Sequence, residues 1–469
     1  MFADFNSFVP ASVSDDLAKK LVNYYLDRLE ANPELHDKIE FDISLTCLPF
    51  DFEYRVRPLR EAGFTDGELS EIEGGLRKIT HGAFKRVERG VDMKNIDKLE
   101  TRFHQIKQTD MPPLQAVRAL LEDCRRLGTL PFAHLARAAF VAVSLLRSLE
   151  RKDIITDSQH TRFLNSLQTV AREFEHDGYR VASSDLELDE YVDRYGHIRP
   201  GTYDITSPRY AADPESYFRP TIETATPPEN NLDPQKIFDG ETKVEIEEEL
   251  AAIGLPADAD RFVEFVRHAI VGREYSKFVF TKNLSLALEK LAAFGEQHDL
   301  DRETLSHVAI QDVLELTTGQ PPANPGDWLE ARAEEGRTRH TIAQAVELPP
   351  LVTDEYEFDA FERPAGEPNF VTSETVRAPI AEPDENEDIE LDGRIVFIPQ
   401  ADPGYDWLFG YDIAGLVTMY GGTNSHMAIR AAEFGLPAAI GVGESLYEQL
   451  TSTTILELDC EARTLERVR

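Results

Sequence analysis

Apolar side chains near the start of the sequence recur at the spacing of an α-helix. Ser14 precedes the run as a candidate N-cap, and acidic residues follow it directly. The pair Asn-Pro at 32–33 ends the pattern. The sequence therefore predicts a helix over about 15–31. The positions that fall on its one apolar face are Leu17, Leu21, Tyr25 and Leu29.

The same periodicity covers much of the first three quarters of the chain. The stretch 113–150 is predicted as two helices broken at Gly128–Pro131, because Gly and Pro punctuate helices. More helix is predicted up to about Tyr191, and helices resume over about 242–317. The segment "RYGHIRPGTYDITSPRY" (194–210), rich in Gly and Pro, is predicted as an irregular loop.

After about residue 392 the pattern changes. Short apolar runs such as "GRIVFIP", "AGLVTMY" and "PAAIGVG" have the length and composition of strands, and "HMAIRAAEFG" between two of them is helical. The stretch "TILELDCEARTLERV" is predicted as a strand and hairpin. Strands and helices that alternate at this spacing are typical of a small α/β domain.

The predicted fold class is a multidomain protein with a mostly α N-terminal and middle region and a small C-terminal α/β domain. A Pro- and Asn-containing run, "TATPPENNLDPQ", separates two helical parts, and a Pro-rich, acidic stretch precedes the last domain. The predicted units are a helical region over 1–230, a second helical part over 236–348, a linker over 349–392 and the α/β domain over 393–469.

Composition narrows the class of partner. The formal net charge is −37, which disfavours nucleic acid and anionic membranes because both repel such a surface. We see no run of about 18 apolar residues and no signal-peptide pattern, so no membrane partner is predicted. The three cysteines are far apart, without metal-type spacing, and are expected to be reduced thiols of a cytoplasmic protein.

One histidine, His426, stands where the helix predicted over 425–434 begins. A helix N-terminus offers free N–H groups and partial positive charge, which favour a neutral ring and stabilise an anion held on it. Gly421 and Gly422 let the backbone approach a charged group closely. Residues that can hydrogen-bond phosphoryl oxygens precede the ring: Thr423, Asn424 and Ser425. This arrangement suits a histidine that carries a phosphoryl group, whereas the alternative is a histidine with a structural hydrogen bond.

The stretch "MYGGTNSHMAIRAAEFGLPAAIGVG" (419–443) resembles the phosphohistidine swivelling domain of phosphoenolpyruvate-utilising enzymes. The family motif is roughly G-G-x-T-S-H-x-A-I-x-A-R-E-x-G-I-P-A-V-x-G. Asn424 departs from the Thr of many members, and Ala432 replaces the usual Arg. The resemblance implies a swivelling β/β/α domain in which His426 accepts a phosphoryl group. The matching positions are Gly421, Gly422, Ser425, His426, Ala428, Ile429, Ala431, Glu433, Gly435, Pro437, Ala438 and Gly441.

Upstream segments such as "GTLPFAHLARAAFVAV", "REYSKFVFTKNLS" and "ADPGYDWLF" resemble the middle and C-terminal parts of rifampin phosphotransferases and L-glutamine kinases. In those proteins an ATP-grasp domain phosphorylates the histidine. We find no such domain in the sequence, so the resemblance implies a separate ATP-grasp kinase protein as partner. ATP and Mg²⁺ are expected at that partner, and neither a cofactor nor a metal site is predicted in this chain. The pyruvate-binding barrel of phosphoenolpyruvate synthase is also missing, which disfavours that type of enzyme.

Two segments are candidates for binding the acceptor. The 194–210 loop carries two guanidinium groups that could clamp a phosphoryl group and an aspartate that could act as base, although Arg–Asp pairs could instead staple the loop. The residues that carry these groups, together with a neighbouring histidine, are His197, Arg199, Asp204 and Arg209. In "REYSK", Arg273 and Lys277 share a helix face with Glu274 turned elsewhere, as in rifampin phosphotransferases, or they form a solvated face.

The sequence thus predicts a phosphotransferase component in which His426 passes a phosphoryl group to a small-molecule acceptor. The amide of L-glutamine is the best single guess for that acceptor. The alternative is a non-catalytic or truncated member that acts as a phosphocarrier or regulatory subunit.

Overall fold

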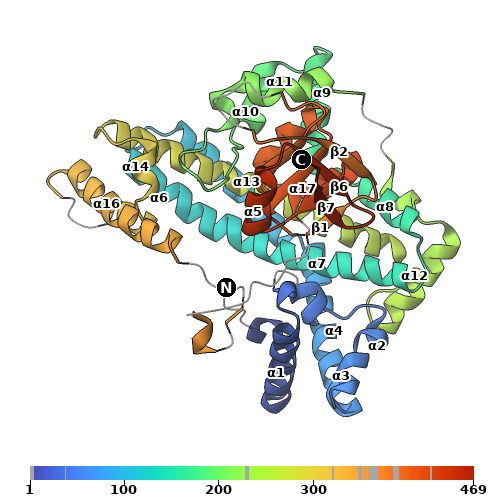
Figure 1. Ribbon diagram of the computed structural model, residues 1–469. Helices are drawn as coiled ribbons and strands as arrows, with labels where there is room; N and C mark the ends of the chain where they lie inside the picture. The colour runs from blue at the N-terminus through green and yellow to red at the C-terminus, as the bar shows by residue number, and fades with distance from the viewer. Residues whose placement is uncertain are drawn as a thin grey trace.

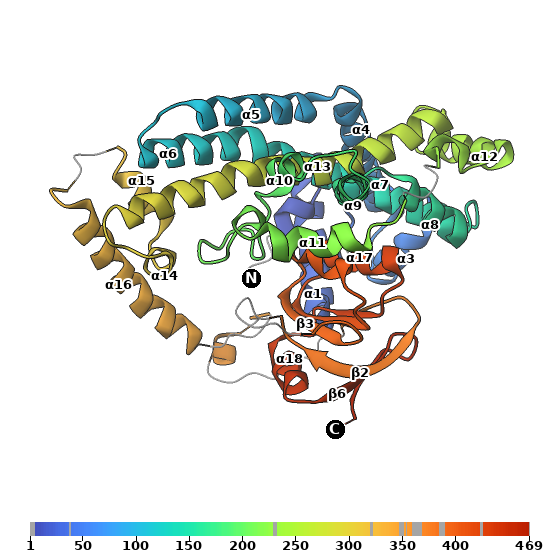
Figure 2. The same cartoon turned by 90° about the horizontal axis from the view of Figure 1, so that it is seen from above.

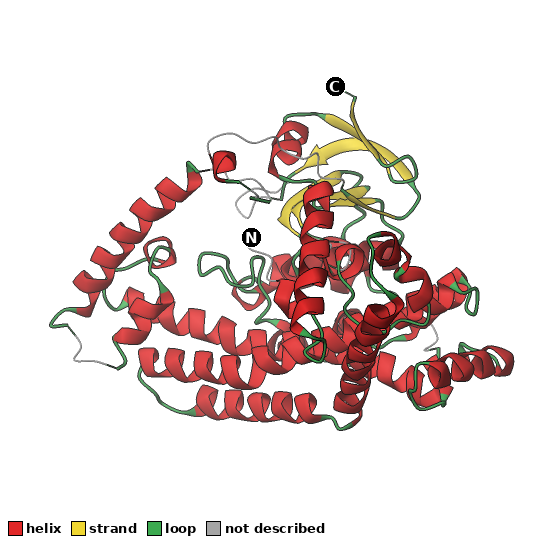
Figure 3. Ribbon diagram, turned by 90° about the horizontal axis from the view of Figure 1, so that it is seen from below, coloured by secondary structure: helices red, strands yellow, loops and turns green. Residues whose placement is uncertain are grey.

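Helices make up most of the molecule, and the described strands gather in its C-terminal part (Figures 1 and 3). This computed structural model describes residues 5–36, 39–227, 232–318, 322–346, 351–352, 354–358, 368–383, 390–422 and 425–468. The longer N-terminal helices are α1 (Asp15–Ala31), α4 (Asp66–Glu88), α5 (Val91–Gln108), α6 (Pro113–Asp123), α7 (Leu130–Arg151), α8 (Asp157–Ser166), α9 (Val170–Ala182), α10 (Leu188–Tyr195), α11 (Pro214–Thr224), α12 (Gly240–Ala252), α13 (Ala259–Glu296) and α16 (Pro325–Gln344). Shorter ones are α2 (Phe52–Arg55), α3 (Arg57–Glu61), α14 (Arg302–Ser306) and α15 (Ile310–Glu315).

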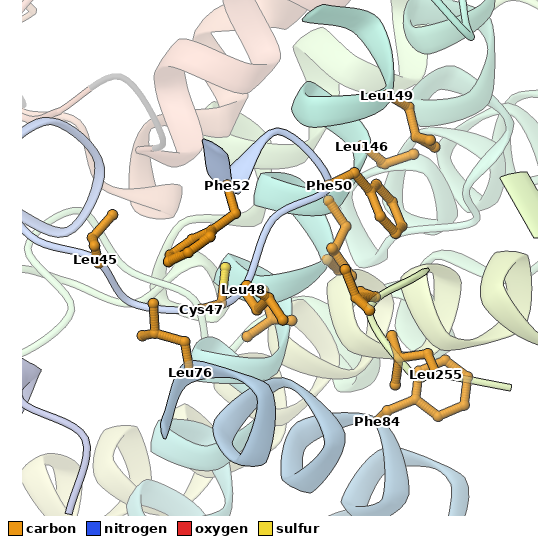
Figure 4. Packing of buried hydrophobic residues seen from close by; sticks show 14 of the residues in the cluster. Leu45, Cys47, Leu48, Phe50, Phe52, Leu76, Phe84, Leu146, Leu149 and Leu255 are labelled. Carbon is orange, nitrogen blue, oxygen red and sulfur yellow. The ribbon is translucent and has the colours of Figure 1, made fainter. Parts of the chain in front are cut away.

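The first helix, α1, forms as the sequence predicts. Ser14 occupies the N-cap position, and the last helical residue is Ala31, directly before Asn32. All four residues of the predicted apolar face are buried. They pack into a core that also takes up the segment 45–52 between α4 and α7 (Figure 4). Burying one such Leu or Phe side chain contributes roughly 1.5–3 kcal/mol.

The long helix α13 is the spine of the helical part, with α5, α6 and α7 packed along it (Figure 2). Asp258 caps its start by accepting a hydrogen bond from the backbone N–H of Arg261 at 3.0 Å. Two glycines allow the close helix contacts. A Cβ on Gly128 would lie 2.6 Å from Phe280 Cβ, and one on Gly272 would lie 3.3 Å from Leu135.

The break predicted at Gly128–Pro131 is not a break. A π-helical turn over Cys124–Thr129 joins α6 to α7, so the helix runs on from Pro113 to Arg151. Pro131 directly follows the π-helical turn and lies in the first turn of α7, where the missing N–H of proline is tolerated. This helix is long and apolar enough to cross a membrane by length and composition alone, and it packs against α13 and α4 as a core helix.

The C-terminal part is built on a seven-stranded sheet of order β1-β5-β4-β3-β2-β6-β7. β2, β3, β4 and β5 are parallel neighbours, and the outer strands pair antiparallel to them. Its elements are β1 (Asn369–Val371), β2 (Thr375–Ala381), β3 (Ile395–Gln400), β4 (Gly415–Tyr420), α17 (His426–Phe434), β5 (Ala438–Ile440), α18 (Glu444–Thr451), β6 (Ile455–Asp459) and β7 (Thr464–Arg467). The helical N-terminal part and the small C-terminal α/β part therefore agree with the predicted fold class.

The predicted linker over 349–392 differs from the structure in one stretch. β1 and β2 fall inside it, and both pair with strands of the C-terminal sheet. β2 carries Arg377 and Pro379 and lies between β3 and β6, whereas β1 is an edge strand that pairs with β5. Other parts of the predicted linker, 359–367 and 384–389, lie outside the described residues.

A 3-10 helix, η8 (Pro403–Gly410), packs against α11 and joins the C-terminal part to the helical part. A Cβ on Gly404 would lie 2.0 Å from the carbonyl oxygen of Arg199, and one on Gly410 would lie 2.7 Å from Pro220 Cβ. Tyr210 donates its hydroxyl to the Gly404 carbonyl at 2.8 Å. The two parts therefore touch backbone to backbone along η8.

Candidate functional site

The candidate histidine begins α17. Ser425 is the N-cap, and its hydroxyl accepts a hydrogen bond from the backbone N–H of Ala428 at 3.3 Å. Gly435 ends the helix in the left-handed region at φ 64°. Both helix ends therefore lie where the sequence predicts them. Thr423 and Asn424, the other candidates for holding phosphoryl oxygens, lie outside the described residues.

The two glycines before the helix have different roles. Gly421 adopts φ +143°, and a Cβ there would lie 2.5 Å from Ala401 Cβ, so this position needs glycine for local packing. Gly422 has open space around it, since an added Cβ would meet nothing within 4 Å. Only Gly422 therefore leaves room beside the backbone for a ligand.

The ring of His426 lies between two carboxylates. Its Nε2 is 2.6 Å from Asp406 Oδ1, and its Nδ1 is 4.0 Å from Glu274 Oε2. Burial alone would raise the pKa of the Asp406 carboxyl. His426 and Arg430 offset this effect and hold the pKa below its ordinary value. Asp406 is therefore ionised and fixes the orientation of the ring.

Arg430 lies one turn after His426 on α17, and its side chain is only 4% exposed. Its Nε is 3.4 Å from Asp406 Oδ1, and its Nη2 donates to the carboxylate of Glu175 on α9. The guanidinium also lies over the ring of Phe434 at 4.7 Å. Arg430 thus ties the helix of the histidine to the helical part of the molecule.

A cavity of about 240 Å³ lies where the two parts meet, and His426 lines it. Most of the lining is apolar and comes from α7, α8, α9 and α13, with side chains such as Phe140, Val143, Leu167 and Phe278. Its two carboxylates are Glu274 and Asp406, whereas its five cationic side chains are Arg147, Arg199, Arg273, Lys277 and Arg430. The cavity wall is thus positive in a chain of net charge −37, which suits a phosphoryl group.

The "REYSK" segment faces this cavity from the middle of α13. Arg273 and Lys277 both line it, as their shared helix face predicts. Arg273 Nε is 3.7 Å from Glu274 Oε1, and Lys277 has no ion-pair partner among the described residues. Glu274 was expected to point elsewhere, but it lines the cavity beside His426. Glu274 and Arg273 are adjacent in sequence, and both can line the cavity because it is wider than one face of α13.

His197 also lines the cavity, at the edge of the 194–210 loop. Its Nε2 lies 3.1 Å from the carbonyl oxygen of Phe278, which can only accept, so Nε2 carries the hydrogen. Burial lowers the pKa of His197 to about 3. The ring is therefore neutral and serves as an uncharged part of the wall.

The other candidates in that loop do not form a clamp. Arg199 lines the cavity, but its guanidinium donates to the carbonyls of Asp204 and Ser207 and to Glu289 Oε1, at 3.2, 3.1 and 3.0 Å. The Asp204 carboxylate accepts from the backbone N–H of Thr206 at 2.8 Å. The Arg–Asp pairs of the loop-stapling alternative do not occur among the described residues of 194–210. Arg199 instead holds the loop through backbone carbonyls and Glu289.

Arg209 lies 3.9 Å from Glu289 Oε2, and neither it nor Asp204 lines the cavity. The structure therefore brings His197, Arg199, Arg273, Lys277 and His426 to one cavity. The described candidates outside its lining are Asp204, Arg209, Gly421, Gly422 and Ser425. Sequence reasoning missed Asp406, Glu274 and Arg430. Arg430 carried a signal, since it is four residues after His426 on the same helix face.

No group of three or more His, Cys, Asp or Glu side chains that could hold a metal ion occurs among the described residues.

A family model described as "PEP-utilising enzyme, mobile domain" matches residues 389–463, which include His426, Asp406 and Arg430. Rifampicin phosphotransferase of Bacillus subtilis (strain 168) is 27% identical over 322 residues, which are 62% of this chain and 35% of that protein. Rifampicin phosphotransferase of Bacillus cereus (strain ATCC 14579) is 26% identical over 291 residues, 54% of this chain and 31% of that protein.

The chain thus spans about a third of the length of the curated relatives that it matches. The family match covers the docked C-terminal part, and the relatives extend the similarity into the helical part that forms the cavity. The C-terminal part is therefore similar to the mobile domain of PEP-utilising enzymes, and 62% of the chain is similar to a rifampicin phosphotransferase.

Proposed function

We propose that this chain is the phosphoryl-carrying and acceptor-binding part of a phosphotransferase. His426 receives a phosphoryl group and passes it to a small molecule in the cavity. The observation that carries the proposal is the position of the His426 ring at a cavity that also holds Glu274, Arg273 and Lys277. The names of the relatives, which are phosphotransferases acting on rifampicin, support the same class of reaction.

The transfer step assigns each residue a role. One ring nitrogen of His426 carries the phosphoryl group and the other carries hydrogen, so that the ring leaves as neutral imidazole when the N–P bond breaks. The new bond forms between phosphorus and a hydroxyl or amide of the acceptor. Glu274, beside the ring, takes the proton that the acceptor loses. Arg273 and Lys277 stabilise the negative charge on the phosphoryl oxygens during transfer.

The phosphoryl donor is assigned to a separate ATP-grasp protein that binds ATP and Mg²⁺. A helix N-terminus presents His426 for loading, and undocking of the C-terminal part would expose it to such a partner. The proposal predicts that this chain, alone with ATP and Mg²⁺, does not label His426.

The lining of the cavity bears on the acceptor. Phe140, Val143, Leu167 and Phe278 surround a space that suits an acceptor with a sizeable apolar body and one reactive polar group. The amide of L-glutamine, favoured from the sequence, stays a second candidate because the cationic wall can hold its carboxylate. Rifampicin and L-glutamine are therefore the two first probes.

Glu274→Gln provides the test. The protein is phosphorylated chemically with potassium phosphoramidate, and loss of phosphate from His426 is followed with and without each probe. The proposal expects acceptor-dependent loss in the parent protein and a roughly 10²-fold or greater slowing in Glu274→Gln, the scale of a lost general base.

Loading of His426 should be unchanged in that variant. Discharge that no acceptor accelerates in the parent would favour the non-catalytic phosphocarrier instead. Equal rates in parent and variant would remove Glu274 from the mechanism.

A further inference from the structure

Both nitrogens of the His426 ring face carboxylates in the docked molecule. The 2.6 Å between Nε2 and Asp406 Oδ1 is a short, charge-assisted hydrogen bond, which leaves no space for a phosphorus atom on that nitrogen. On the other side, Glu274 Oε2 lies 4.0 Å from Nδ1, where phosphoryl oxygens would touch it. The docked arrangement thus fits the unphosphorylated ring.

Two of the nearby cations are paired with carboxylates, whereas Lys277 has no ion-pair partner among the described residues. Arg430 is bound between Asp406 and Glu175, and Arg273 lies 3.7 Å from Glu274. A phosphoryl dianion on His426 would therefore lie against the carboxylates of Asp406 and Glu274 in the docked arrangement. Juxtaposed like charges oppose association strongly in such interfaces.

We propose that Asp406 is a positioning residue that makes docking of the C-terminal part depend on the phosphorylation state of His426. Its carboxylate holds the unphosphorylated ring in the cavity, and a phosphoryl group on the ring displaces it and loosens the docked contact. The inference rests on the proposed function, because it takes His426 to be the phosphoryl carrier.

The thermodynamic linkage between docking and phosphorylation gives the contact between Asp406 and His426 a function. If docking is weaker for the phosphorylated protein, then docking must by the same factor favour loss of the phosphoryl group. The carboxylate of Asp406 would thereby help to drive transfer once the histidine is seated. It would also hold the discharged histidine until the C-terminal part leaves for reloading.

Trp407, next to Asp406 on η8, reports docking directly. Its ring packs edge-on against Tyr217 of α11 at 6.0 Å, across the contact between the two parts. The sequence contains one other tryptophan, Trp328. In Trp328→Phe protein, undocking should therefore shift tryptophan emission to longer wavelength. Gly404→Val supplies the undocked reference, because its side chain would clash with the Arg199 carbonyl.

The experiment compares emission before and after treatment of Trp328→Phe protein with potassium phosphoramidate, with the phosphate on His426 measured by mass spectrometry. We expect a shift towards the reference, with the ratio of docked to undocked protein lowered about tenfold or more. His426→Ala in the same background should show no shift, although other histidines are phosphorylated. Asp406→Asn keeps the shape but removes the charge, and should lose at least half of the shift.

A second comparison needs no phosphorylation. His426→Glu places a fixed negative charge beside Asp406 and should shift the emission, whereas His426→Gln should not, and adding Asp406→Asn to His426→Glu should restore docking. Emission that stays unchanged in protein fully phosphorylated on His426, or in His426→Glu, overturns the proposal, as does an equal shift in Asp406→Asn. None of these measurements uses an acceptor. The docking proposal can therefore be contradicted while acceptor-dependent transfer is observed, and transfer can be absent while docking changes as proposed.

Discussion

At the scale of single residues, the site differs from a solvent-exposed histidine in the environment of the side chains that line the cavity. Lys277 has no ion-pair partner among the described residues, yet it lines the cavity beside His426. His197 is neutral because burial, not a neighbouring charge, is the largest effect on its pKa. Lys277 therefore predicts an effect on phosphoryl transfer, whereas His197 predicts an effect on stability.

Replacing Lys277 by Met should slow discharge of phosphorylated His426 to an acceptor by about 10²-fold or more, as the loss of a charge-stabilising group does. Chemical phosphorylation of His426 should stay the same. Lys282→Met is the matched control, because Lys282 lies on the same helix, pairs with Glu100 and does not line the cavity. Similar slowing in both variants would contradict a role for Lys277.

His197 predicts a dependence of stability on pH. Its pKa in the folded protein is about 3, below the ordinary value of 6.5, so the unfolded chain binds more protons between these values. Stability from this residue is full above about pH 6.5 and is lost as the pH falls towards 3, by up to roughly 1.4 kcal/mol per pH unit.

In His197→Gln the free energy of unfolding, measured by urea titration at several pH values, should fall less steeply with acid. His36→Gln, a change at an exposed histidine, is the control and should keep the slope. An unaltered slope in His197→Gln would contradict a neutral buried ring.

At the scale of elements, the helix of the site could be predicted and the loop could not. Ser425 and Gly435 fix the ends of α17 through local hydrogen bonds and backbone preference, which are properties of the sequence itself. The contacts of Arg199 with Glu289 join residues 90 positions apart, so no local pattern shows which way the guanidinium turns. A loop with two arginines and an aspartate has the same sequence pattern whether its side chains bind a phosphoryl group or hydrogen-bond within the protein.

Arg199→Ala should therefore act on stability. Its side chain is 1% exposed, and its removal leaves two loop carbonyls without this donor, whereas Glu289 keeps its ion pair with Arg302. The expected cost is about 1–3 kcal/mol in the free energy of unfolding. Arg209→Ala removes a half-exposed arginine 3.9 Å from the same glutamate and should cost less than about 1 kcal/mol. Full stability together with lost transfer in Arg199→Ala would restore the phosphoryl clamp.

At the scale of the whole molecule, the cavity exists only because two distant parts of the chain meet. His426 and Glu274, which both line it, are 426 − 274 = 152 positions apart, and Arg430 pairs with Glu175 across 255 positions. The resemblance in the last domain identified His426, but its neighbours Asp406 and Glu274 come from the 3-10 helix η8 and from the middle of a 38-residue helix. The way in which the C-terminal part packs against the helical part determines which side chains surround the His426 ring. The periodicity of apolar residues in the sequence does not indicate this packing.

The most direct test of the account is where the phosphoryl group resides. The protein is incubated with labelled ATP, Mg²⁺ and an ATP-grasp kinase protein, and the labelled residue is identified by mass spectrometry. The account predicts an acid-labile, base-stable phosphoryl group on His426 that is absent in His426→Ala and retained in His36→Ala. Label that persists in His426→Ala, or that resides on another residue of the parent protein, would contradict it.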